Sequence, residues 1–140
     1  MTAGLDKARA ALACGKTLVL VKGDGVIGFT ERGVRPLLEL LDGGTILAEY
    51  SVADRVVGAG AAHLYRILGL RAIYAEVISE EALSVLSSDV TVEYGTLVPY
   101  IKNRRGDGRC PIEECVSGVT DSHAALTLIR KRLAELEGAK

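Results

Sequence analysis

The sequence is poor in aromatic residues, in net charge and in long apolar runs. It contains no Trp, one Phe and five Tyr, and its formal net charge is −1. Proteins that bind single-stranded nucleic acid without sequence preference stack bases on aromatic side chains, which are scarce here. A nearly neutral chain is not attracted to nucleic acid or anionic membranes, and no apolar run approaches the ~20 residues of a membrane span. We therefore expect neither nucleic acid nor a membrane as a partner.

Cysteine is also scarce, and the chain has only Cys14, Cys110 and Cys115. An odd number of cysteines without a signal-like apolar N-terminus is typical of reduced thiols, so we expect a cytoplasmic protein. Because 49% of the residues are hydrophobic, a chain of this length can bury a core without a disulfide, a metal or another cofactor. The length of 140 residues predicts a single domain over residues 1–140, and we expect no cofactor.

Apolar periodicity and turn signals predict strands that alternate with helices. Residues 17–21 and 26–30 flank a Gly-Asp-Gly turn that is typical of an antiparallel hairpin. A hairpin followed by such alternation predicts an α/β fold with a mixed sheet covered by helices. Further strands are expected at 46–50, 71–78 and 90–94, and helices at 4–14, 33–41, 51–68, 79–86 and 121–136.

One candidate ligand site lies at the start of the expected helix at 51–68. Ser51 is followed three residues later by Asp54, which is the spacing of a helix-capping box in its Asp form. Asp54 and Arg55 then either complete the cap or face a pocket and bind a polar ligand.

Gly58 and Gly60 fall inside the same expected helix, where each glycine costs about 1 kcal/mol relative to alanine. Close packing of the helix on the sheet accounts for them. Their place inside a helix, and His63 where a third glycine would stand, argue against a dinucleotide-binding turn. His63 itself is expected to be a partly buried structural residue.

The most site-like segment is the polar stretch 102–115, KNRRGDGRCPIEEC. Asn103, Arg104 and Arg109 surround a Gly-Asp-Gly turn, so arginine side chains and backbone amides are available to an anion. The alternative is a solvated charged loop whose cysteines are incidental.

Cys110 is a candidate catalytic residue. Pro111 is suited to the first turn of a helix that Cys110 would cap, where the helix dipole and the nearby arginines favour the thiolate. Glu113 in the same turn opposes this, so the sequence leaves the reactivity of Cys110 open. Cys115 would serve as a resolving thiol. A metal site with His123 as a third ligand is disfavoured, because the Cys-x₄-Cys spacing is wide for zinc and no second pair exists.

Four stretches of the chain together resemble a known family: VADRVVGAGAAHLY, IYAEVISEEAL, TLVPYIKNRRGDGRCPIEE and GVRPLLELL. They are similar to the family catalogued as domain of unknown function 1893, over roughly residues 17–115. The resemblance implies a cytidine-deaminase-like fold, which is a three-layer α/β/α sandwich. The N-terminal and C-terminal helices flank the stretch that carries the resemblance.

A zinc deaminase on that fold needs a His or Cys with a Glu at one helix start and Pro-Cys-x-x-Cys at the next. The corresponding places in this chain hold Ala-Asp-Arg at 53–55 and Ser-Glu-Glu at 79–81, which offer no such ligands. Cys110-Pro111 inverts the order of the motif and falls too late in the chain. We therefore predict no zinc-dependent deamination and no metal site.

Our leading hypothesis is a small-ligand-binding domain for anionic or nucleotide-like compounds, and it leaves open whether the protein is an enzyme. Two alternatives belong to other classes: a thiol-dependent enzyme or redox protein that uses Cys110, and a non-catalytic homo-oligomer joined through a sheet edge or a helix face. The residues expected to bind the ligand are Asp54, Arg55, Asn103, Arg104, Arg109 and Glu113.

Overall fold

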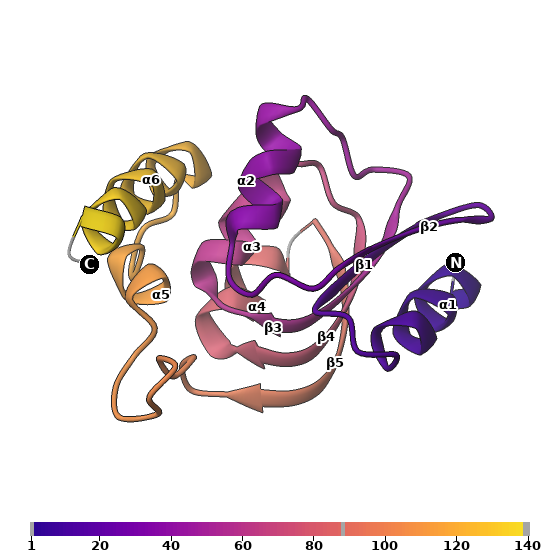
Figure 1. Ribbon diagram of the computed structural model, residues 1–140, viewed down its shortest axis with the longest axis horizontal. Helices are drawn as coiled ribbons and strands as arrows, with labels where there is room; N and C mark the ends of the chain where they lie inside the picture. Colours follow the sequence, from indigo (N-terminus) through magenta and orange to yellow (C-terminus); the bar gives the residue numbers. More distant parts are fainter. Residues whose placement is uncertain (1, 88, 139–140) are drawn as a thin grey trace.

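Five strands form a mixed sheet in the computed structural model, which describes residues 2–87 and 89–138 (Figure 1). Across the sheet the strands lie in the order β2-β1-β3-β4-β5. Strand β4 is parallel to β3 and β5, whereas β1 is antiparallel to both of its neighbours. The predicted mixed sheet is thus confirmed, with the bounds β1 Leu18–Lys22, β2 Gly25–Phe29, β3 Ser51–Val57, β4 Ala72–Ser79 and β5 Thr91–Val98.

Helices cover both faces of the sheet, which gives three layers (Figure 1). On one face α1 packs Ala8 and Leu12 against Val19, Val21 and Ala53. The other face carries the larger core, and there α5 and α6 pack against α3. No helix in the described ranges is both long and apolar enough to cross a membrane. The helices are α1 Thr2–Leu12, α2 Arg35–Asp42, α3 Ala59–Ile67, α4 Glu80–Leu86, α5 Pro111–Cys115 and α6 Ser122–Gly138.

The hairpin β1–β2 follows from its turn residues. The register pairs Lys22 with Gly25, so the turn itself holds Gly23 and Asp24. Gly23 has a φ of 59°, and Asp24 does not share that positive φ. A two-residue turn with positive φ at its first position is of type II′, whose twist suits a hairpin. The expected antiparallel hairpin is therefore confirmed.

The prediction of one helix over 51–68 is wrong, because β3 occupies its first half and α3 starts only after Gly58. Val52, Ala53 and Val57 are all buried, since β3 lies between β1 and β4 with helices on both faces. A strand buried on both faces shows no alternation of polar and apolar residues, so its sequence is easily taken for a helix. The capping-box spacing at its start is a coincidence.

Two smaller differences concern strands. Residues 46–50 form no strand, and the N–H of Tyr50 instead donates to the carbonyl of Leu47 at 3.1 Å in a turn. Strand β5 is longer than expected and takes in part of the apolar stretch that follows 90–94. Both differences concern short apolar runs, whose periodicity is too brief to distinguish a strand from a helix or a loop.

Gly58 and Gly60 lie where another segment of the chain approaches the start of α3. Gly58 is the N-cap residue at a strand–helix turn, so it is not inside a helix as predicted. A Cβ added to Gly60 would stand 2.7 Å from Cγ2 of Ile112, and one added to Gly58 would stand 3.1 Å from Cγ1 of Ile101. The two glycines therefore serve the approach of α5 and of the chain after β5, rather than packing of the helix on the sheet.

Replacing Gly60 with alanine tests this contact. Alanine normally stabilises a helix by about 1 kcal/mol relative to glycine, but here its methyl group overlaps the buried Ile112. We expect Gly60→Ala to lower the free energy of unfolding by about 1–3 kcal/mol in urea denaturation. Gly138→Ala is the control, because no atom lies within 4 Å of a Cβ at that position. A Gly60→Ala variant as stable as the wild type would contradict the proposed contact.

Candidate functional site

Two helices start at the carboxyl ends of neighbouring parallel strands, which is where open α/β sheets bind ligands. Helix α3 follows β3, and its N-cap residue Gly58 has no side chain to accept the first amides. Helix α4 follows β4 directly and is capped by Ser79, whose Oγ accepts the N–H of Ala82 at 3.1 Å. We take this edge of the sheet as the candidate site.

The carboxylate of Glu113 fills the space between the two helix starts. Its Oε2 accepts the N–H of Ala59 at 3.0 Å and the hydroxyl of Ser79, and its Oε1 accepts the N–H of Ile101. Glu113 is 4% exposed, so this charge is buried and depends on these donors. A carboxylate at the start of a helix is also stabilised by the helix dipole. Glu113 thus caps α3 in place of the missing side chain of Gly58.

Glu113 is one of the residues expected to bind a ligand, and it does reach the candidate site. However, both of its carboxylate oxygens are engaged by groups of the same chain. The geometry makes Glu113 an anchor that fastens the segment after β5 to the sheet edge.

That segment folds into a small hairpin over residues 101–110. Lys102 and Arg109 form an antiparallel bridge, and the N–H of Cys110 donates to the carbonyl of Ile101 at 2.8 Å. Asn103 organises the turn, because its Oδ1 accepts the N–H groups of residues 106 and 107 and its Nδ2 donates to the Asp107 carboxylate at 2.9 Å. These backbone amides are therefore not free for an anion, contrary to the expectation from the sequence.

The hairpin exposes a cluster of positive charge. Arg109 lies over the ring of Tyr100, with 4.7 Å from the guanidinium carbon to the ring centroid. Arg104 and Arg105 are exposed at the turn. Within residues 2–87 and 89–138, no carboxylate forms a salt bridge with any of these arginines. Their guanidinium groups are therefore the donors that this segment offers to a ligand.

The two cysteines near the hairpin differ in what they contact. Cys110 is the N-cap residue of α5, as predicted, but its side chain makes no capping hydrogen bond. The thiol of Cys115 donates to the carbonyl of Ile112 at 3.2 Å, and burial raises the pKa of Cys115. A raised pKa leaves less of the reactive thiolate at neutral pH. Cys115 is thus poorly suited to resolve a disulfide, and the nucleophilic role of Cys110 stays a prediction.

Asp54 and Arg55 do not form one site, because they are neighbours in a strand and point to opposite faces of the sheet. The Arg55 guanidinium donates to the carbonyls of Leu12 and Lys16 at 3.0 and 2.7 Å, and lies 3.1 Å from the Glu76 carboxylate. Because Leu12 ends α1, Arg55 places a positive charge at the negative end of that helix. Arg55 therefore holds α1 against the sheet.

Asp54 faces the opposite layer, where its Oδ2 accepts the hydroxyl of the buried Tyr65 at 2.6 Å. Burial raises the pKa of Asp54 to about 7, although the hydrogen bonds from Tyr65 and from the N–H of Val56 act in the other direction. A carboxyl group that titrates near neutral pH is a feature of many functional sites and also of buried structural pairs. Sequence patterns gave no signal for Tyr65, which is drawn to Asp54 by the packing of α3 on the sheet.

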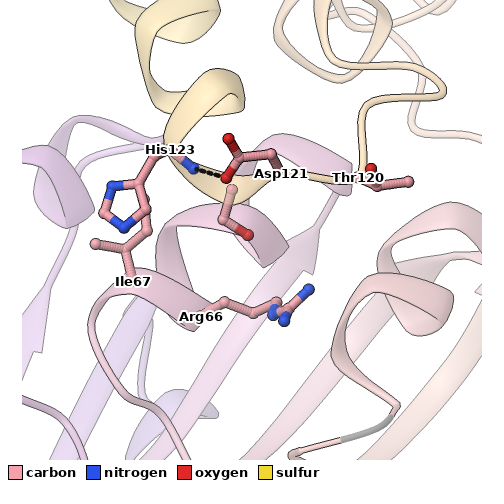
Figure 2. A pocket seen from close by; sticks show the side chains of 6 residues that line it. Arg66, Ile67, Thr120, Asp121 and His123 are labelled. Carbon is pink, nitrogen blue, oxygen red and sulfur yellow. Dashed lines mark hydrogen bonds between the residues drawn. The ribbon is translucent and has the colours of Figure 1, made fainter.

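A surface hollow lies elsewhere, between the end of α3 and the start of α6 (Figure 2). Its volume is about 250 Å³, and Figure 2 shows Asp121 turned back onto the N–H of His123, with which it forms a hydrogen bond of 3.1 Å. Behind the hollow, Nδ1 of the fully buried His63 lies 2.9 Å from Oγ of Ser122. The described residues offer its Nε2 no partner, and burial lowers the pKa of His63.

The hollow is not strongly charged, because its lining contains Arg66 and the opposing carboxylate of Asp121. Arg66 also lies 3.6 Å from the Asp89 carboxylate. Nowhere in residues 2–87 and 89–138 do three His, Cys, Asp or Glu side chains gather closely enough to hold a metal ion. The basic hairpin at the carboxyl edge therefore remains the strongest candidate for a charged ligand.

The profile of a protein family described as "Domain of unknown function (DUF1893)" matches residues 8–133, which is most of the chain. The chain belongs to the DUF1893 family. The crystal structure of a DUF1893 family protein from Thermotoga maritima is similar, with a TM-score of 0.84 and 24% sequence identity over 96% of this chain and 91% of that one. No curated protein matches. The family thus establishes a shared fold and leaves the function open.

The anchoring role of Glu113 in this DUF1893 chain is tested by its removal. Glu113→Ala leaves the buried N–H of Ala59 and the hydroxyl of Ser79 without their acceptor. We expect a loss of about 2–4 kcal/mol in the free energy of unfolding, with a smaller loss in Glu113→Gln, which keeps one acceptor oxygen. The adjacent Glu114 is exposed and serves as the control. Glu114→Ala should change the free energy of unfolding by less than about 0.5 kcal/mol. Equal effects at positions 113 and 114 would contradict the anchoring role.

The raised pKa of Asp54 predicts a pH dependence of stability in the same chain. The folded state keeps this proton up to about pH 7, whereas an unfolded Asp loses it near pH 4. The contribution of the protonated Asp54 to the free energy of unfolding is therefore lost as the pH rises from about 4 to about 7. We expect the free energy of unfolding of Asp54→Asn to rise by about 2–4 kcal/mol relative to that of the wild type between about pH 4 and pH 8. Each pKa unit corresponds to about 1.4 kcal/mol, and the expected value is reduced because Asp54 is only half-buried.

Thermal unfolding from about pH 4 to pH 8 measures this difference. The exposed Asp42, which pairs with Arg130 at 2.9 Å, supplies the control variant Asp42→Asn. A difference between Asp54→Asn and wild type that stays constant over this range would show that Asp54 titrates at its ordinary pKa.

Proposed function

We propose that this chain binds a small anionic ligand, such as a phosphorylated or nucleotide-like compound, on a deaminase-like scaffold. The observation that carries the proposal is the exposed hairpin over residues 101–110, which contains two adjacent arginines at its turn, a third arginine, a lysine and a single acidic residue. This concentration of positive charge occurs in a chain whose formal net charge is −1. Arginine side chains match the oxygens of phosphate and carboxylate groups through paired hydrogen bonds.

The position of the hairpin supports the proposal. It is fastened by Glu113 to the edge where α3 and α4 begin, and its turn is braced by Asn103. A binding segment that is ordered before the ligand arrives loses less conformational entropy on binding. In this arrangement Arg104, Arg105 and Arg109 contact the ligand, while Asn103 and Glu113 position them.

The deaminase-like part of the proposal is supported by the layered mixed sheet and by the two helix starts at one edge. A zinc ion does not fit there. The helix starts present Gly58, the hydroxyl of Ser79 and the carboxylate of Glu113, and neither an imidazole nor a thiolate. Zinc sites need three or four ligands of the His, Cys, Asp and Glu types. A zinc-activated water therefore takes no part in the proposed function.

Thermal-shift titrations with pyrophosphate, AMP and ATP test the proposal, each against NaCl at the same ionic strength because salt screens exposed charges. We expect at least one of these anions to raise the Tm of the wild type. Arg104→Ala and Arg105→Ala should each weaken its binding about tenfold, which corresponds to about 1.4 kcal/mol. Lys131→Ala is the matched control, because Lys131 is an exposed cation on α6.

Two outcomes would overturn the proposal. One is that none of the three anions stabilises the protein beyond the NaCl reference. The other is that binding survives in Arg104→Ala and Arg105→Ala but is lost in Arg66→Ala, which would place the anion in the hollow beside α6.

A further inference from the structure

Strand β2 forms one edge of the sheet and is open on both faces. It pairs with β1 on one side, and on its other side it pairs with no strand of the described residues. Val26 is 47% exposed and Ile27 is 46% exposed, although they point to opposite faces. The unpaired N–H and C=O groups of such an edge are a template for another strand.

Natural proteins protect open edges with lysine, proline or a covering segment. Residues 25–30, GVIGFT, contain no charge and no proline. The opposite edge differs, because β5 carries Glu93 within the strand. The side chain of Lys16, from the segment before β1, lies over Gly28 on one face. The strand itself carries neither charge nor proline and exposes apolar side chains on both faces, which are features of an interface rather than of a free surface.

The register of the hairpin shows which backbone groups point outward. Lys22 and Gly25 close a two-residue turn, and the pair that closes such a turn exchanges both backbone hydrogen bonds. Bonded and non-bonded pairs then alternate along the strands. Gly25, Ile27 and Phe29 therefore direct their backbone groups to β1, and Val26 and Gly28 direct theirs outward.

The edge can pair with β2 of a second copy of the chain. In this arrangement the two strands run antiparallel, and Gly28 of one chain lies opposite Gly28 of the other. Outward-directed residues then meet one another, with Gly28 opposite Gly28 and Val26 opposite Thr30 of the other chain. On the same face as α2, Ile27 lies opposite Phe29, so apolar side chains pair across the junction. Every second pair in this register exchanges backbone hydrogen bonds.

The charges at the two ends of the strand favour this register. Asp24 lies in the turn that precedes β2, and Arg32 lies three residues beyond its last residue, Phe29. Both are exposed, so the segment has a negative charge at one end and a positive charge at the other. Pairing two antiparallel copies centred on Gly28 brings the end that carries Asp24 to the end that carries Arg32 of the other chain. Opposite charges across paired strands stabilise one register over its neighbours.

We propose that two copies of the chain associate through β2, antiparallel and about a two-fold axis at Gly28, and so join their sheets into one. The partner is a second copy, because the sequence of the edge is complementary to itself. In Figure 1 this edge lies on the opposite side of the sheet from the hairpin over residues 101–110. The association is therefore independent of the proposed anion binding, and either can fail without the other.

Sedimentation velocity over a range of protein concentrations tests the proposal. We expect a monomer–dimer equilibrium in the wild type, weakened at least tenfold in Val26→Lys, because a lysine on an edge strand opposes pairing. Val56→Lys is the matched control, because Val56 is also 47% exposed but lies in the central strand β3. A wild type that stays monomeric, or equal weakening by the two variants, overturns the proposal.

Exchanging the end charges tests the register. Asp24→Arg and Arg32→Asp should each weaken the dimer, and the double variant Asp24→Arg/Arg32→Asp should restore it, since each chain then again meets an opposite charge. Both positions are exposed, so the monomer should keep its fold, which far-UV circular dichroism checks. Failure of the double variant to restore the dimer overturns the two-fold at Gly28.

Discussion

The buried carboxylate of Glu113 is the contact on which the carboxyl edge of the sheet depends. It joins the start of α3, the cap of α4 and the chain leaving β5, which are separate in sequence. A buried charge is tolerated only when donors surround it, and here two backbone amides and one hydroxyl do so. The same contact explains why Gly58 and Gly60 begin α3, since larger residues would keep α5 away. The basic hairpin owes its place to this anchor.

The sheet separates two polar residues that are adjacent in the sequence. Asp54 lies under α3 with Tyr65, and Arg55 lies under the end of α1 with Glu76. Strand geometry alone imposes this, because successive side chains point to opposite faces. Each residue thus fastens a different helical layer to β3. The pKa of Asp54 is raised because α3, packed on the sheet, partly shields this carboxyl group from water.

The two edges of the sheet differ in chemistry. Beyond β5 the chain becomes polar and basic and is held by specific hydrogen bonds, which suits a ligand that is recognised by charge. At β2 the chain is uncharged and apolar and leaves its backbone groups open, which suits another strand. Backbone pairing needs flat, uncharged sequence, whereas anion binding needs fixed cations, so one edge is poorly suited to both.

Elements that depend on neighbouring residues could be predicted from the sequence. The Gly-Asp-Gly turn predicted the β1–β2 hairpin, and Pro111 marked the start of α5 with Cys110 at its N-cap. The exposed arginines of the candidate site were also visible, because a polar stretch of glycines and charges rarely enters a core. The helix expected at 79–86 is present as α4, which begins directly after Ser79, its N-cap residue.

In contrast, the strand at residues 51–57 and the anchoring role of Glu113 follow from the packing of distant segments. A strand in the middle of a sheet is buried on both faces, so its sequence lacks the alternation that marks a strand. Glu113 had the pattern of an ordinary acidic residue in the first turn of a short helix, and its partners Ala59 and Ser79 precede it by 54 and 34 residues. These hydrogen bonds cannot be predicted from the residues around Glu113, because their donors reach its carboxylate only when distant segments of the chain pack together.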